Sequence, residues 1–428
     1  MPDTNNLQVE SPEQAGFSMK RMGRIKDVVR ENIEKDNLPG AITMVVRGDK
    51  LIHYDVQGYT DIETKKPLEG NSIFRMYSMT KPVTATAIMM LYEEGKVMLD
   101  EPVAKYIPAF TNQSVITNQA PTGKALYWPR GRIYTEPVER DITIRDLLTH
   151  TAGLASTRQT PAFFIKELTD AIKGSNHFPN DDGSLSVNQS VRQTIDKLAR
   201  IPLSFQPGTN WNYGFEFAVL GLIVEIITEK SLEEFFQKRI FQPLGMIDSS
   251  FNLPESKVEQ LVTEHAWDDS WKLKIHERPQ ESIKLGEAKD IFYGTGSYGG
   301  ILSTAHDYLR FCRMLSNRGE LDGVRLLSPK SIELMAANHT PGLYNYVRGY
   351  GWGYGFGFGI KTDLTKSNCI GSVGAYGWSG LACTYFVIDP AEQLIGLALS
   401  QVLGYGFKPG FCFHQQFEKA VYQAIEVM

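Results

Sequence analysis

Apolar residues recur with two different periods in the first sixty positions. In residues 18–35 they recur at spacings of three and four, which predicts an amphipathic helix beginning near Ser18. Residues 41–46 and 51–56 are rich in β-branched and other apolar residues, and a short polar linker, Arg-Gly-Asp-Lys, joins them. This pattern predicts a β-hairpin directly after the helix.

The end of the chain shows a similar pattern. Residues 383–388 and 394–400 are apolar runs on either side of Asp-Pro-Ala-Glu, which predicts a second hairpin, and an amphipathic stretch around 414–427 predicts a closing helix. Strands near both ends, with helices outside them, favour one sheet assembled from the two ends of the chain. The expected fold class is therefore α/β, in the α+β sense: an antiparallel β-sheet flanked by helices on both faces.

The middle of the chain has a different pattern. Thr143 and Asp146 have the spacing of a capping box at the start of a short helix, and the same signature recurs at Ser231. Loops rich in Pro, Asn and Gly separate these helices. This pattern predicts a mostly helical domain inserted into the sheet domain. The expected boundaries are 1–104 and 296–428 for the sheet domain and 105–295 for the insertion.

Composition narrows the class of protein. With 428 residues the chain is longer than one core usually grows, which agrees with a large insertion. Apolar residues make up 42% and charged residues 22%, proportions that exclude a fibrous or largely disordered chain. The net charge is −5 and no run of Lys and Arg occurs, so no nucleic-acid partner is expected. The sequence does not indicate an oligomeric state.

Membrane and export signals are not evident in the sequence. Residues 1–6 are polar and lack the basic-then-apolar order of a signal peptide. The longest apolar stretch, residues 217–228, is too short to cross a bilayer and contains Glu225. We therefore expect no membrane span and a cytoplasmic location.

The motifs for metals and cofactors are absent or weak. The four cysteines are scattered without a C-x-x-C pair, so reduced, buried thiols are expected, with no metal site and no cofactor. Residues 294–299 match Gly-x-Gly-x-x-Gly, but the preceding stretch is polar and broken, so a tight turn is expected there rather than a dinucleotide site. No Gly-x-Ser-x-Gly nucleophile elbow occurs.

The strongest chemical signal is a Ser-x-x-Lys motif formed by Ser78 and Lys81. An apolar helix follows it and can end at Gly95. A serine at a helix N-terminus lies where unpaired N–H groups favour negative charge, and a lysine three residues later returns to the same side of the helix. A partly desolvated ammonium has a lowered pKa and can take the serine proton. The pair therefore forms a candidate nucleophile and base.

Two later segments can complete such a site. Tyr213 follows a Pro-Gly-Thr-x-Trp turn, and a phenol near a cationic lysine can relay a proton. Residues 376–381 read Tyr-Gly-Trp-Ser-Gly-Leu and directly precede a strand. The N–H of Leu381, together with that of Ser78, could donate to an oxyanion.

These three segments resemble the motifs of the serine β-lactamase and penicillin-binding-protein superfamily. The nearest branch in this resemblance is the family VIII carboxylesterases, which are similar to class C β-lactamases. Residues 143–154 and 299–308 are also typical of the superfamily, and the resemblance spans residues 12–425. It implies Ser78 as the acylated nucleophile, Lys81 and Tyr213 sharing the roles of base and acid, and an oxyanion hole made by the N–H groups of Ser78 and Leu381. The sequence leaves open whether Lys81 or Tyr213 takes the first proton.

Departures from the superfamily pattern point to the substrate class. Phe215 stands where β-lactamases and peptidases carry an asparagine that binds the substrate amide, and Phe cannot hydrogen-bond. Trp378, followed by Ser379 and Gly380, stands where those enzymes carry Lys-Thr-Gly, so an apolar face replaces a charge. We expect these four residues to bind an uncharged, short-chain acyl ester.

Three other functions remain open. An acyltransferase would form the same acyl-enzyme and pass the acyl group to an alcohol or amine. A β-lactamase or D-peptidase activity would use the same nucleophile on an amide. The third is that of a catalytically silent protein, which would use the cleft only for binding.

Some conspicuous residues have plain structural interpretations. His150 is interpreted as a structural hydrogen-bonding residue. In residues 350–359 aromatic residues alternate with glycine, which predicts one strand with an aromatic face. We expect this face to pack in the core, where the glycines admit a close helix; alternatively, the aromatic residues line an acyl pocket. The polar residues 264–290 are expected to form a surface loop rather than a lid.

Overall fold

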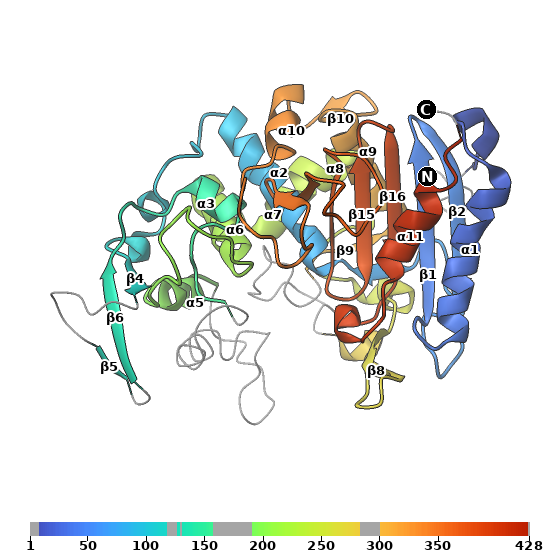
Figure 1. Cartoon of the computed structure of the whole chain (residues 1–428), viewed down its shortest axis with the longest axis horizontal. Helices are drawn as coiled ribbons and strands as arrows, with labels where there is room; N and C mark the ends of the chain where they lie inside the picture. Colours follow the sequence, from blue (N-terminus) through green and yellow to red (C-terminus); the bar gives the residue numbers. More distant parts are fainter. Residues whose placement is uncertain (1–7, 118–125, 129–130, 157–190, 283–299, 427–428) are drawn as a thin grey trace.

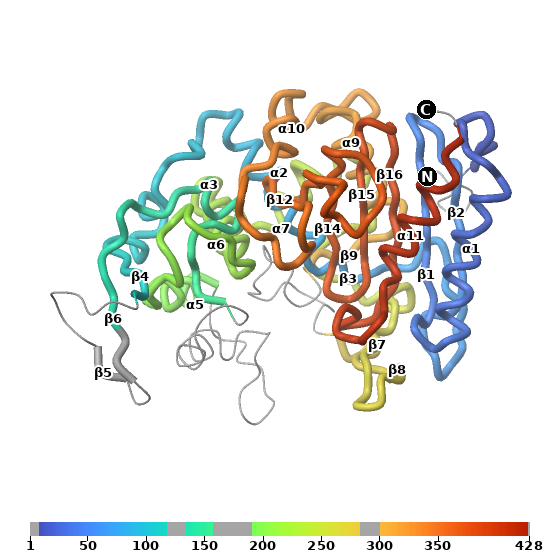
Figure 2. The backbone as a smooth tube through the Cα atoms, in the orientation of Figure 1, coloured from blue at the N-terminus to red at the C-terminus, as the bar shows by residue number. Residues whose placement is uncertain are grey.

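The structure is a computed structural model that describes residues 8–117, 126–128, 131–156, 191–282 and 300–426. Its centre is a seven-stranded antiparallel sheet in the order β12-β13-β14-β15-β16-β1-β2. Both predicted hairpins are present, and β16 from the end of the chain pairs with β1 from its start, Leu399 opposite Ile42 (Figures 1 and 2). The strands are β1 Gly40–Arg47, β2 Lys50–Gly58, β12 Trp352–Tyr354, β13 Gly359–Lys361, β14 Tyr376–Ser379, β15 Thr384–Asp389 and β16 Leu394–Leu399.

Helices cover both faces of this sheet, as predicted. Successive side chains of a strand alternate between faces, so Val45 belongs to the core that includes residues of α1 and α11, while Val46 belongs to the core on the opposite side. That second core holds α9, which lies against β15 and β16, and α2, which packs against α6. The helices are α1 Met19–Glu34, α2 Thr80–Glu93, α9 Ala305–Ser316 and α11 Phe413–Tyr422.

Most of the other helices lie between residues 105 and 295. The Thr143 hydroxyl accepts from the Asp146 N–H and the carboxylate of Asp146 accepts in return, which is the predicted capping box. These helices are α3 Ile144–Leu148, α5 Val191–Leu198, α6 Glu216–Thr228, α7 Leu232–Phe236 and, after a π-helical turn, α8 Gln242–Leu244. The same range contains a small sheet of β4 Ser114–Thr117, β5 Leu126–Trp128 and β6 Gly131–Pro137. The proposed domain boundaries stay a prediction.

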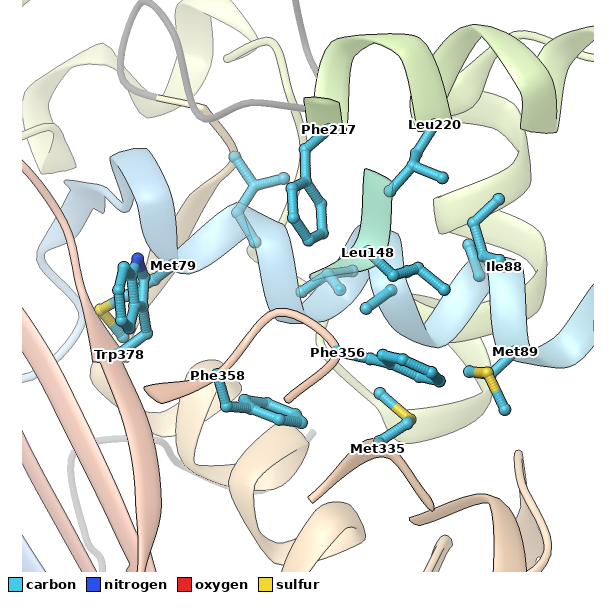
Figure 3. Packing of buried hydrophobic residues seen from close by; sticks show 14 of the residues in the cluster. Met79, Ile88, Met89, Leu148, Phe217, Leu220, Met335, Phe356, Phe358 and Trp378 are labelled. Atoms are coloured by element: carbon cyan, nitrogen blue, oxygen red, sulfur yellow. The ribbon is translucent and has the colours of Figure 1, made fainter. Parts of the chain in front are cut away.

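Helix α2 runs through the core that joins these parts. Every residue from Thr80 to Leu91 is buried, and Figure 1 shows α2 between the sheet and α3 and α6. Figure 3 shows Met89 of α2 close to Phe356 and Met335. Gly357 has φ +85° and its Cα faces α2, where a Cβ would lie 3.1 Å from the Lys81 carbonyl oxygen. The helix that follows Ser78 is therefore held on several sides.

Two predictions about irregular segments are wrong. Residues 350–359 form no single strand, because the chain turns at Gly355–Phe358 and makes the hairpin of β12 and β13. The aromatic residues at 354, 356 and 358 are buried in the core, which agrees with the packing interpretation. The predicted surface loop contains a two-stranded sheet, β7 Glu264–Trp267 and β8 Leu273–Glu277, whose polar residues concealed the strands. The glycine-rich turn at 294–299 lies outside the described residues.

The remaining strands and the remaining α-helix of the described residues are short. They are β3 Ile73–Arg75, β9 Leu302–Thr304, β10 Glu320–Leu321, β11 Val324–Arg325 and α10 Pro329–Met335. Among the described residues, none of the helices combines the length and apolarity needed to cross a bilayer. All four cysteines are free, but only Cys312 and Cys383 are buried, so the prediction of buried thiols fails for Cys369 and Cys412.

Candidate active site

The turn that presents Ser78 is strained and well supported. Tyr77, directly before it, has φ +48°, a left-handed conformation that costs a non-glycine residue about 1–2 kcal/mol. The buried Tyr77 phenol donates to the Glu264 carboxylate at 2.6 Å, which helps to hold this backbone in place. A 3-10 turn, Tyr77–Met79, then leads into α2. Ser78 is half-buried and therefore reachable, while its neighbours on both sides are buried.

Lys81 lies against the Ser78 hydroxyl. Its Nζ is 3.1 Å from Ser78 Oγ, within hydrogen-bond distance, and its side chain is only 2% exposed. Burial lowers the pKa of Lys81 to about 7, although the negative charge of Glu216 opposes this shift. A large fraction of the amine is thus neutral near pH 7, and a neutral amine can accept the serine proton.

Tyr213 completes the cluster from the other part of the molecule. The loop before α6 places its ring centroid 4.7 Å from Lys81 Nζ. Its hydroxyl accepts a hydrogen bond from Trp378 Nε1 at 3.1 Å, and its backbone N–H donates to the Tyr346 hydroxyl at 3.0 Å. The structure therefore brings together the serine, lysine, tyrosine and tryptophan that the three sequence segments indicated.

Ser78, Tyr213 and Trp378 line a cavity of about 230 Å³, whereas Lys81 is not among its lining residues in the described part of the chain. Its other lining residues are Leu381, Ser379, Gly380, Tyr346, Val347 and residues 404–407. Phe215 is not among the lining residues in the described part of the chain; it packs against the hydrophobic core. Its role in binding substrate stays a prediction.

Gly380 brings the Leu381 turn close to Ser78. A Cβ at this position would lie 2.5 Å from the Met76 carbonyl oxygen and 2.2 Å from Thr384 Oγ1. Glycine at this position therefore makes room for the backbone before Ser78. In the described part of the chain no hydrogen bond is donated by the Leu381 N–H, and this residue lines the same cavity as Ser78.

A buried hydrogen bond between His150 and Glu216, behind Tyr213, was not predicted. His150 Nδ1 lies 2.6 Å from Glu216 Oε2, and both side chains are fully buried. The His150 ring centroid is 4.5 Å from that of Tyr213. Burial lowers the pKa of His150, with Glu216 opposing and Lys81 adding to the shift. His150 thus makes the hydrogen bond expected of it, and Glu216 adds a negative charge near Lys81.

We expect this charge to tune the basicity of Lys81. Because Glu216 raises the pKa of Lys81 against the effect of burial, Glu216→Gln should lower that pKa further. The ascending limb of the pH profile of kcat/KM should then move to lower pH. Steady-state rates between pH 5 and 9 measure this shift.

Glu225→Gln provides the matched control. It removes a carboxylate from the same helix, α6, about two and a half turns further along. In this variant the ascending limb of the pH profile of kcat/KM should stay at the wild-type position. An unmoved limb in Glu216→Gln would contradict the electrostatic role of this carboxylate.

Comparisons with known proteins agree with this geometry. The sequence profile of the family described as Beta-lactamase matches residues 25–418. Protein Rv1367c of Mycobacterium tuberculosis is 32% identical over 392 residues, which cover 87% of this chain and 88% of that protein. Esterase EstB of Burkholderia gladioli is 26% identical over 398 residues, covering 88% and 89%. The structure of EstCE1, described as a hydrolase with promiscuous acyltransferase activity, superposes with a TM-score of 0.74 at 24% identity, covering 94% and 99%.

Proposed function

Because the chain belongs to the beta-lactamase family, a group of serine hydrolases, we propose that it is a serine carboxylesterase that forms an acyl-enzyme on Ser78. The observation that carries this proposal is the 3.1 Å contact between Ser78 Oγ and the buried Lys81 amine. The name of the relative EstB supports an ester as the substrate.

The residues divide the chemistry between them. The serine proton passes to Lys81 or Tyr213 as Oγ attacks the ester carbonyl carbon, and the N–H groups of Ser78 and Leu381 stabilise the negative oxygen. The proton then passes to the leaving alcohol as the C–O bond breaks. Water attacks the acyl-enzyme in the same way, releases the acid and returns the proton to Ser78.

The cavity lining favours an uncharged, short acyl group. Trp378 contributes an apolar ring beside Ser78, and its N–H is occupied by the Tyr213 hydroxyl. Of the residues that line this cavity in the described part of the chain, none carries a charged side chain. Ser379 and Gly380 complete this wall.

Mass spectrometry of the intact protein tests the acyl-enzyme directly. A fluorophosphonate probe should add its mass once to the native protein and not at all to Ser78→Ala. The control Ser379→Ala should still be labelled, because Lys81 contacts Ser78. Labelling of Ser78→Ala at the native level would reject Ser78 as the nucleophile.

The same preparation separates the competing activities. Short-chain p-nitrophenyl esters should be hydrolysed faster than nitrocefin, and a nitrocefin rate that rivals them would favour the β-lactamase alternative. Adding an alcohol tests acyl transfer, because an acyltransferase would yield a new ester rather than the free acid. Failure of every ester and probe to react would favour the silent binding protein.

A further inference from the structure

A second cavity adjoins the first. It has a volume of about 170 Å³ and shares three lining residues, Val347, Ser379 and Tyr405, with the cavity at Ser78. Two cavities with a common wall can hold two ends of one molecule. The second differs from the first because two charged side chains, Arg348 and Glu418, line it.

Aromatic rings hold the Arg348 guanidinium. Its central carbon lies 5.2 Å from the ring centroids of both Trp378 and Trp352 and 5.3 Å from that of Tyr385. Its Nε is buried without a hydrogen-bond partner, and in the described part of the chain no carboxylate lies within ion-pair distance of the guanidinium. An arginine carries five N–H donors whose planar arrangement matches a carboxylate, so this stacked guanidinium can still donate to a ligand.

The other titratable groups that line the cavity do not balance this charge. Glu418 is 2% exposed and is paired at 3.9 Å with Lys361, which is fully buried. His414 is neutral because burial lowers its pKa to about 3, and Arg348 adds to that effect. The Cys369 thiol is also neutral, since burial raises its pKa to about 12. Since the buried Lys361 compensates Glu418, the Arg348 guanidinium is the charge of this cavity that lacks an oppositely charged partner among the described residues.

We propose that this second cavity binds a carboxylate on the alcohol part of the ester, with Arg348 as its partner. The proposal rests on the proposed function, because a short, uncharged acyl group at Ser78 leaves the carboxylate to the alcohol side. The shared wall of Ser379 and Tyr405 links the reacting carbonyl to Arg348. A planar guanidinium can donate two parallel hydrogen bonds to a carboxylate, which selects this group over a neutral one.

Two matched esters test the charge preference. The acetyl ester of 4-hydroxyphenylacetic acid is anionic, and that of 4-hydroxyphenylacetamide has almost the same shape without the charge. Wild type should show at least a tenfold higher kcat/KM for the anionic ester, mainly through KM. In Arg348→Gln the ratio of the two kcat/KM values should fall about tenfold, and Arg348→Lys should keep part of it.

Lys408→Gln is the matched control. Lys408 also stacks on an indole, that of Trp267 at 4.2 Å, but lies outside the residues that line either cavity. In Lys408→Gln the ratio of the kcat/KM values for the anionic and the neutral ester should equal that of wild type. An unchanged ratio in Arg348→Gln would overturn the proposal, because a merely structural arginine would slow both esters equally. Preference for a carboxylate on the acyl side, as in a succinyl ester, would overturn it too.

A binding measurement separates this inference from the proposed function. In Ser78→Ala, calorimetry should show tighter binding of 4-hydroxyphenylacetate than of its amide, and Arg348→Gln added to this variant should remove the difference. This readout needs no turnover. Equal binding of acid and amide would overturn the carboxylate site even where ester hydrolysis is confirmed.

Discussion

Ser78→Ala is expected to lower kcat/KM for p-nitrophenyl butyrate about 10⁴-fold or more. In serine hydrolases the loss of the nucleophile removes covalent catalysis altogether, and the remaining groups supply only a small residual rate. Here Lys81 would lose the hydroxyl that it contacts at 3.1 Å, so no activated oxygen would remain in the cavity. Initial rates at pH 8, measured with enough enzyme to detect the residual activity, give the ratio.

The fold should survive this substitution. Ser78 is half-buried and its exchange removes one oxygen, so the thermal midpoint should stay within about 2 °C of wild type. Ser270→Ala, at an exposed serine between β7 and β8, should keep wild-type activity. A loss of less than tenfold in Ser78→Ala would mean that another group forms the acyl-enzyme or that none forms.

Much of the fold could be predicted because its signals are local. The two hairpins have apolar runs on either side of short polar linkers, and the capping box at Thr143 depends on a residue three positions away. The placement of Lys81 beside Ser78 also follows from helical spacing alone. In each case the contacting residues are near one another in sequence, so the local sequence pattern is enough to predict the contact.

The rest depends on contacts between distant residues. His150 and Glu216 are 66 positions apart, and only the folded chain pairs them. The sequence did contain one indication of this contact: Glu216 lies at the start of the apolar helix α6, and a buried glutamate needs a polar partner. The strained backbone at Tyr77 is held by Glu264, 187 positions away, from a hairpin whose polar residues concealed it. The Arg348 cavity likewise combines residues from several separate segments.

Lys81→Met is expected to lower kcat/KM about 10³-fold and to change the shape of its pH profile. Methionine fills a similar volume but cannot take a proton, and general base catalysis typically contributes 10²- to 10⁴-fold. In wild type, kcat/KM should rise with pH through a limb near 7, where the buried amine loses its proton. In the variant this limb should disappear, and the remaining activity should be flat between pH 6 and 8.

The thermal stability of Lys81→Met provides the control, because this loss of a catalytic residue should raise the stability of the fold at low pH. Because the pKa of Lys81 is lowered to about 7 from an ordinary 10.5, the unfolded chain holds a proton between these values that the folded protein does not. The free energy of unfolding of wild type therefore falls as pH drops from 10.5 to 7, whereas the Lys81→Met variant carries no such penalty. At pH 6 the variant should thus unfold at a higher temperature than wild type while being far less active. A limb near pH 7 that persists in Lys81→Met would assign the first proton transfer to Tyr213 instead.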